Sequence, residues 1–170
     1  MSTTSSNQTT ANILARPILP DSKQDSTTHL LQQNLVDLVD LALLLKQAHW
    51  NVLGKNFRSI HLQLDDIISD VRNSSDDVAE RIVALGTAAD GRASTVASES
   101  NVDTYPSQFQ SVSSTVTHVA DALAKTVEGL RASIRKLGEL DPISEDMCIG
   151  ISGKLEKHLW MVQAQEVELE

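Results

Sequence analysis

Apolar residues recur at steps of three and four along most of the chain after Thr28, a spacing typical of amphipathic helices. Four such stretches lie near residues 28–54, 56–86, 107–138 and 142–162. Most of the glycines and prolines, which would break a helix, lie outside the stretches or at their ends. Because the chain has 170 residues and only 3% aromatics, we expect one all-α domain with an aliphatic core.

The connections between the stretches predict how the helices are arranged. A short turn, with Gly54 ending the first helix and Asn56 capping the second, makes these two helices antiparallel neighbours. Residues 86–106 form a long link rich in Ala, Ser, Thr and Gly, with room for a short helix near 94–98. Four long helices with one long crossover between the second and third form a ferritin-like four-helix bundle.

Further signals mark the ends of the last two helices. Ser107 begins a sequence that resembles a capping box, so we expect the third helix to start there and to close at Gly138. Asp141 followed by Pro142 is expected to cap and start the fourth helix.

The segment before the helical pattern differs in composition. Residues 1–27 are rich in Ser, Thr, Asn and Gln and show no periodicity, so we expect a flexible tail before a domain spanning 28–168. No secretory signal and no apolar run of membrane-spanning length is evident, which predicts a cytoplasmic protein, with the nucleoid as an alternative, and no membrane partner. The single cysteine, Cys148, has apolar neighbours and is expected to be a buried thiol.

The formal net charge of −9 bears on possible partners. An acidic surface repels the phosphate backbone and attracts cations, metal ions included. The charges of the 1–27 segment cancel, so the usual basic tail for contacting DNA is missing. From the net charge alone, we therefore expect DNA binding to be weak or absent at physiological salt.

Five residues of the first two helical stretches could bind a metal ion: His49, His61, Asp65, Asp76 and Glu80. On an ideal helix, Asp65, Asp76 and Glu80 lie at about 40°, 60° and 100° from His61, so one stripe carries all four. His49 ends the preceding helix and could reach His61. Imidazole and carboxylate groups together suit iron, zinc or manganese.

The spacing separates these residues into two groups. His61 and Asp76 are roughly 22 Å apart along an ideal helix, so no single ion can contact both in one chain. If two copies of the helix pack antiparallel about a two-fold axis, each group meets the complementary group of its neighbour and two complete sites form. The alternative is an ordinary solvated acidic stripe, and periodicity alone leaves the two readings about equal.

The same residues belong to a longer pattern that resembles the signature of the Dps family. The resemblance extends over residues 28–168 and rests on these elements: Lys46-Gln47-Ala48-His49-Trp50-Asn51-Val52-Leu53-Gly54, Asn56-Phe57, His61, Asp65, Asp76, Glu80-Arg81, Tyr105-Pro106 and Lys157-His158-Leu159-Trp160. Several residue types recur at fixed spacing over more than thirty positions, which makes the motif specific.

The resemblance implies a mini-ferritin with ferroxidase activity. Fe(II) would be oxidised by hydrogen peroxide, or more slowly by dioxygen, and ferric oxide stored in a homododecameric shell. His49, His61 and Asp65 would come from one subunit, and Asp76 and Glu80 from its two-fold mate. Trp50 would lie beside the site, either as a catalytic residue that intercepts radicals or as an aromatic core anchor.

Other acidic residues and histidines give weaker indications. Family members line three-fold pores with acidic residues, so Asp141, Glu145 and Asp146 are candidates for an iron-entry pore; stabilisation of a helix start explains them equally well. The three remaining histidines and three acidic residues off the stripe are expected to be structural or solvated: His29, His118, His158, Asp66, Asp70 and Asp77.

Two further observations bear on the class of protein. No Glu-x-x-His sequence occurs, so the intrasubunit di-iron site of larger ferritins is not expected. The predicted ligands would also hold zinc, which could compete with iron. The alternatives to a ferroxidase are a nucleoid protein that protects DNA with secondary iron chemistry, and a purely structural helical oligomer.

Overall fold

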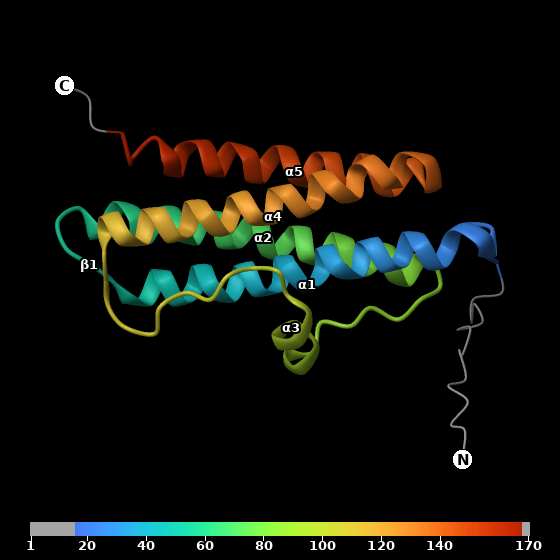
Figure 1. Ribbon diagram of the computed structural model, residues 1–170, viewed down its shortest axis with the longest axis horizontal. Coiled ribbons are helices and arrows are strands. Elements are labelled where there is room, and N and C mark those ends of the chain that lie inside the picture. The colour runs from blue at the N-terminus through green and yellow to red at the C-terminus, as the bar shows by residue number, and fades with distance from the viewer. Residues whose placement is uncertain (1–15, 168–170) are drawn as a thin grey trace, which may run out of the picture.

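The computed structural model describes residues 16–167, and its long helices follow the four stretches of apolar periodicity. α1 is antiparallel to α2, and α4 to α5, in a single bundle (Figure 1). This confirms the all-α ferritin-like four-helix bundle. In chain order the elements are α1 (Asp21–Asn51), β1 (Val52–Leu53), α2 (Phe57–Ala84), α3 (Ala93–Glu99), β2 (Gln110–Ser111), α4 (Val112–Leu140) and α5 (Pro142–Gln163).

The link from α2 to α4 returns along the bundle and carries the expected short helix, α3 (Figure 1). Two polar side chains of α1 hold it in place. Gln32 exchanges hydrogen bonds of 2.7 and 3.0 Å with the backbone of Asp90, and the buried Asp37 carboxylate accepts from the Asn101 amide at 2.8 Å. The link ends where β2 pairs in parallel with β1, with Val52 opposite Gln110.

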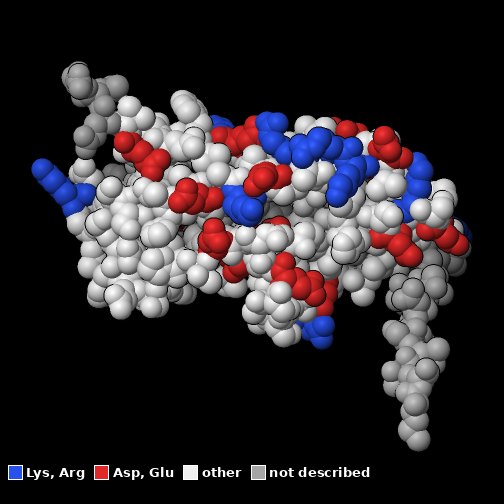
Figure 2. Space-filling model, viewed as in Figure 1, with Lys and Arg blue, Asp and Glu red and all other residues white. Residues whose placement is uncertain are grey.

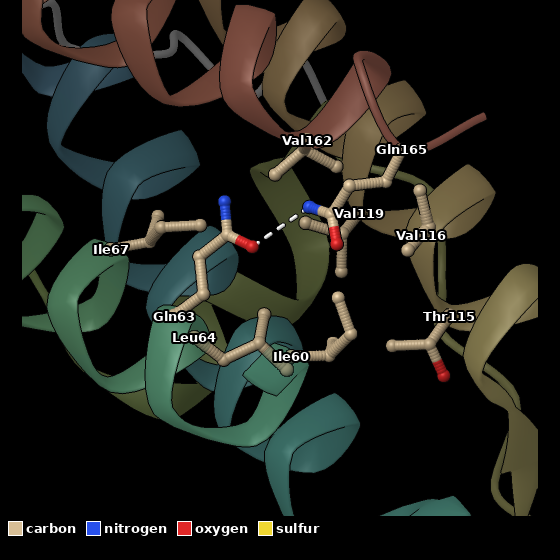
Figure 3. Close-up of a pocket in the computed structure, with 9 residues that line it drawn as sticks. All are labelled: Ile60, Gln63, Leu64, Ile67, Thr115, Val116, Val119, Val162 and Gln165. Atoms are coloured by element: carbon tan, nitrogen blue, oxygen red, sulfur yellow. Dashed lines mark hydrogen bonds between the residues drawn. The ribbon is translucent and has the colours of Figure 1, made fainter. Parts of the chain in front are cut away.

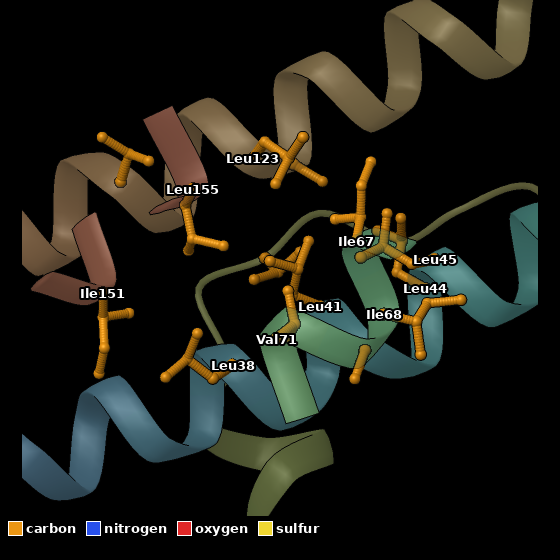
Figure 4. Packing of buried hydrophobic residues seen from close by; sticks show 14 of the residues in the cluster. Leu38, Leu41, Leu44, Leu45, Ile67, Ile68, Val71, Leu123, Ile151 and Leu155 are labelled. Atoms are coloured by element: carbon orange, nitrogen blue, oxygen red, sulfur yellow. The ribbon is translucent and has the colours of Figure 1, made fainter. Parts of the chain in front are cut away.

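The core is aliphatic, as the composition predicted. Leucine, isoleucine and valine side chains from all four long helices interlock between the helices (Figure 4). Cys148 is fully buried among them, and burial raises the pKa of its thiol to about 11, so the thiol is unreactive at neutral pH. No helix within residues 16–167 is long and apolar enough to cross a bilayer.

The first helix begins earlier than its apolar pattern indicates. α1 starts at Asp21, inside the segment expected to be a tail, while residues 1–15 of that segment lie outside the described part of the chain. The first turn closes on the carbonyl of Pro20, which accepts from the Lys23 and Gln24 amides. Gln24 and Thr27 are buried, so polar residues make these early contacts and hydrophobic periodicity could not reveal them.

The limits of α4 also differ from the expectation. The helix starts at Val112, capped by the Ser111 side chain, which accepts from the Ser114 amide at 3.1 Å. The capping box at Ser107 does not form. The helix begins directly after β2, which pairs with β1. Gly138 does not end the helix, which continues to Leu140. A Cβ at this glycine would lie 2.9 Å from the Glu145 carboxylate, so the glycine allows a close approach of α5.

Asp141 caps α5 as expected and has a second role. Its carboxylate accepts from the Ser144 amide at 3.2 Å and from the Ser144 hydroxyl, and it pairs with Arg81 of α2 at 2.6 Å. Burial alone would raise the pKa of this carboxyl, but the hydrogen bonds from Arg81 and Ser144 outweigh burial and lower it. Asp141 is 3% exposed, so within one chain its carboxylate is held inside the protein.

Asp70, which was expected to be solvated, is hydrogen-bonded to a buried histidine. His158 of α5 is buried, and its Nε2 lies 2.7 Å from the Asp70 carboxylate on α2. Asp70 is therefore not simply solvated. His118 packs edge-on against Tyr105 with ring centroids 5.5 Å apart, in keeping with a structural role.

We predict that Asp141→Ala lowers the free energy of unfolding by about 2–4 kcal/mol, because it removes a helix cap and leaves Arg81 without its buried partner. Urea titration at fixed protein concentration measures the change. Asp146→Ala, an exposed position in the same turn, is the control and should change stability little.

The contribution of Asp141 to the free energy of unfolding depends on pH in a defined direction. Because folding lowers the pKa of Asp141, its contribution is present above the unfolded value of about 3.9 and is lost as the pH falls through the folded value. The difference in free energy of unfolding between wild type and Asp141→Ala should therefore decrease below about pH 4. A gap that is absent at neutral pH would contradict this assignment.

Candidate metal centre

The tight connection between α1 and α2 determines where the predicted ligands lie. Gly54 and Asn56 adopt positive φ angles of 119° and 66°, which turn the chain sharply. Asn56 occupies the N-cap position of α2, but its side chain makes no capping hydrogen bond, contrary to the expectation. The turn places the last turn of α1 beside the first turns of α2.

This arrangement brings together three of the five predicted ligands. One ligand atom each from His49, His61 and Asp65 lie within 4.8 Å of one another, and no other such group of His, Cys, Asp or Glu occurs within residues 16–167. The two imidazole rings are stacked with their centroids 3.6 Å apart. Phe57 packs edge-on against His61 at 6.4 Å. We call His49, His61 and Asp65 the histidine half-site.

Hydrogen bonds orient both rings. Nδ1 of His61 lies 3.0 Å from the backbone oxygen of His49, and because a carbonyl can only accept, this nitrogen carries the proton. Nε2 of His61 is then left as a free ligand atom, an orientation common for metal-binding histidines. His49 directs its Nε2 toward Asp65 at 2.9 Å, while its Nδ1 is buried without a partner.

The Asp65 carboxylate is the charged group of the half-site. Lys46 donates to one of its oxygens at 2.8 Å and His49 contacts the other at 2.9 Å. The hydrogen bond from Lys46, followed by that from His49, lowers the pKa of Asp65. Asp65 is therefore ionised at neutral pH, as a metal ligand must be.

The other two predicted ligands lie elsewhere on the same helix. Asp76 and Glu80 are exposed and belong to the second half of α2, which runs unbroken from Phe57 to Ala84. A straight helix separates Asp76 from His61 by roughly 22 Å. The chain thus presents two separate groups of ligands, and we call Asp76 and Glu80 the acidic half-site.

Comparison with known proteins identifies the family. A model of the ferritin-like domain matches residues 28–170. The DNA protection during starvation protein of Mycolicibacterium smegmatis is 36% identical over 148 residues, which cover 87% of this chain and 81% of that protein. The chain belongs to the Dps family. A second Dps-family relative of the same name, from Agrobacterium fabrum, is 30% identical over 88% of this chain and 93% of its own length.

Solved Dps structures share the fold closely. The tetragonal form of Mycobacterium smegmatis Dps superposes with a TM-score of 0.84 at 36% identity, covering 88% of this chain and 91% of that chain. Dps from Microbacterium arborescens in its high-iron form gives a TM-score of 0.85 at 31% identity, covering 91% and 100%. The likeness therefore extends over most of the chain.

Trp50 is not the core anchor that was one of its two interpretations. Its side chain is 65% exposed beside His49, and Leu53 and Phe57 near it are also exposed. Exposed large apolar side chains grouped at one place usually mark a surface that another protein covers. In this chain the surface adjoins the histidine half-site, because Phe57 packs against His61.

A pocket between α2, α4 and α5 offers no competing site. Figure 3 shows it bounded mostly by aliphatic side chains and closed by Gln165, which donates to Gln63 at 2.8 Å. Its free volume of about 10 Å³ is no more than one water molecule requires, and no ionisable side chain lines it. Compared with this pocket, the histidine half-site is therefore the better candidate for chemistry.

Lys46 is the residue at this site to which no role was assigned from the sequence. It precedes His49 by three positions, so both side chains leave α1 on the same face. That spacing was a usable signal. The contact between Lys46 and Asp65 could not be inferred from this spacing, because it also depends on α2 presenting Asp65 to the same face of α1.

We predict that Zn²⁺ stabilises the protein through the histidine half-site. At a hundredfold excess over the dissociation constant, binding to the folded state contributes about 2.7 kcal/mol, which raises the melting temperature. Asp65→Ala should lose most of this rise. Asp66→Ala removes the neighbouring exposed carboxylate and should keep it. An equal rise in all three proteins would contradict metal binding at Asp65.

Proposed function

We propose that this protein is a mini-ferritin that oxidises Fe(II) with hydrogen peroxide, or more slowly with dioxygen, and stores ferric oxide in a hollow homododecamer. The observation that carries the proposal is the convergence of His49, His61 and Asp65, with ligand atoms within 4.8 Å of one another at the surface. Two imidazoles and a carboxylate suit Fe(II), and three protein ligands leave coordination positions open.

The open positions support a site shared between two subunits. Iron needs further oxygen ligands, and the acidic half-site, Asp76 and Glu80, offers them exposed on the same helix. An antiparallel pairing of two α2 helices about a two-fold axis would place each acidic half-site against the partner's histidine half-site. The exposed apolar residues Trp50, Leu53 and Phe57 would be covered by the same association.

The proposed chemistry balances with two iron ions for each peroxide. Each Fe(II) gives up one electron, and hydrogen peroxide takes two electrons and two protons to form two water molecules. Two irons held near one oxidant favour this two-electron reduction over release of a hydroxyl radical. Trp50, which is exposed next to His49 in the sequence, would intercept radicals that do escape.

An entry route for iron is proposed with fewer residues than the sequence indicated. Asp146 is exposed and Glu145 is half-buried in the first turn of α5, and both remain candidates to line a pore. Asp141 is removed from this set because Arg81 and Ser144 occupy its carboxylate.

Zinc is the expected competitor. The half-site ligands bind Zn²⁺ more tightly than Fe(II) by the usual order of metal affinities. We therefore propose that zinc occupies the same site and inhibits iron oxidation.

DNA protection by binding is the second function considered, and charge argues against strong binding. The net charge is −9, and the basic side chains over α4 and α5 are interspersed with acidic ones (Figure 2). Of the basic residues in the 1–27 segment, Lys23 donates to the Glu139 carbonyl at 2.6 Å. We predict no mobility shift of duplex DNA at physiological salt. A sub-micromolar shift would contradict this prediction and direct attention to Arg16 and Lys23.

We predict that the assembled protein oxidises Fe(II) with hydrogen peroxide under anaerobic conditions several times faster than a protein-free control. Two Fe(II) should be consumed per peroxide, with the iron retained in a large soluble particle and little hydroxyl radical trapped. His61→Ala should lose the acceleration, and Asp66→Ala should keep it. No acceleration by wild type would contradict the proposal.

A further inference from the structure

Lys46 places a permanent positive charge inside the histidine half-site. Its ammonium group reaches from α1 to the first turns of α2 and lies 2.8 Å from Oδ1 of Asp65. Its side chain is 25% exposed and that of Asp65 is 46% exposed, so water reaches the pair. The contact joins the two helices that carry the ligands.

Both oxygens of Asp65 have a partner in this arrangement. Oδ1 accepts from Lys46, and Oδ2 lies 2.9 Å from Nε2 of His49. His49 can become a ligand through Nε2 in the tautomer that carries its proton on Nδ1, because a neutral imidazole has one nitrogen with a free lone pair. An ammonium group has donors only and cannot coordinate a metal ion. A metal at the half-site must therefore share the carboxylate with Lys46.

We infer that Lys46 is a positioning residue that leaves Asp65 one oxygen for a metal ion and keeps the affinity of the half-site low. This inference rests on the proposed function, since it concerns the same site. In the metal-free protein, Lys46 holds the carboxylate beside the two imidazoles. Lys46 would keep Oδ1 when a metal ion binds, so that Asp65 would offer the ion a single oxygen.

Electrostatics give the size of the effect. A divalent ion bound at Oδ2 lies within a few ångströms of the Lys46 ammonium. Even with strong solvent screening, repulsion between these charges weakens binding by about tenfold or more. The loss of metal affinity is reduced, but not removed, because Lys46 also keeps Asp65 oriented for binding.

Weak binding is useful when the ion is a substrate. Iron must leave the half-site after oxidation, and tight binding of the ground state would slow turnover without helping the chemical step. Lys46 thus distinguishes this half-site from a structural metal site, in which no fixed cation competes for the carboxylate.

The test is calorimetric titration of the full-length assembled protein with Co²⁺, which needs no turnover. Lys46→Met keeps much of the aliphatic stem and removes the charge, so its dissociation constant should fall about tenfold. Lys46→Arg keeps the charge and should stay close to wild type. Lys55→Met removes an exposed charge from the same end of the protein and should also stay close to wild type.

The outcomes separate the two claims. If wild type binds Co²⁺ and Lys46→Met binds no more tightly, the role of Lys46 is contradicted while the metal site stands. If neither protein binds, the proposed site and the inference both fall. Lys46→Gln serves as a second charge-free variant should the Met variant fail to assemble, and it should likewise bind more tightly than wild type.

Discussion

The straightness of α2 is the constraint from which the functional account follows. The helix is unbroken from Phe57 to Ala84, so its rise keeps His61 and Asp76 roughly 22 Å apart. No rearrangement of side chains can close that distance. If the two groups of metal ligands on α2 form one site, as we propose, a second chain is required, and an antiparallel mate would supply each group with its complement. Catalysis and assembly would then depend on the same contact between subunits.

The short turn after α1 determines the geometry of the histidine half-site. It sets His49 against His61 and lets the backbone oxygen of His49 fix the proton on the His61 ring. The same packing brings Lys46 onto Asp65. One backbone feature thus determines the ligand geometry, the tautomer and the local charge, which together decide how tightly a metal can bind.

The sequence predicted the helices and the ligand pattern because both depend on local spacing. Leu31, Leu35 and Leu38 reveal α1 by periodicity, and the Asp141-Pro142 pair marks the start of α5. The features that the sequence did not predict depend on contacts between residues distant in sequence. The hydrogen-bonded pair of Asp70 and His158 joins residues on α2 and α5, and the start of α4 is set by pairing with β1. The role of Lys46 was missed for the same reason, because it depends on the contact between α1 and α2.

Mixing experiments on assembled shells test the shared site most directly. One chain would carry His49→Ala and His61→Ala, and a second chain Asp76→Ala and Glu80→Ala. Each should be inactive alone in Fe(II) oxidation by hydrogen peroxide, while mixed assemblies, verified by mass, should recover part of the activity where intact half-sites meet. Confirmed mixed assemblies that remain as inactive as either parent would contradict a site shared between subunits.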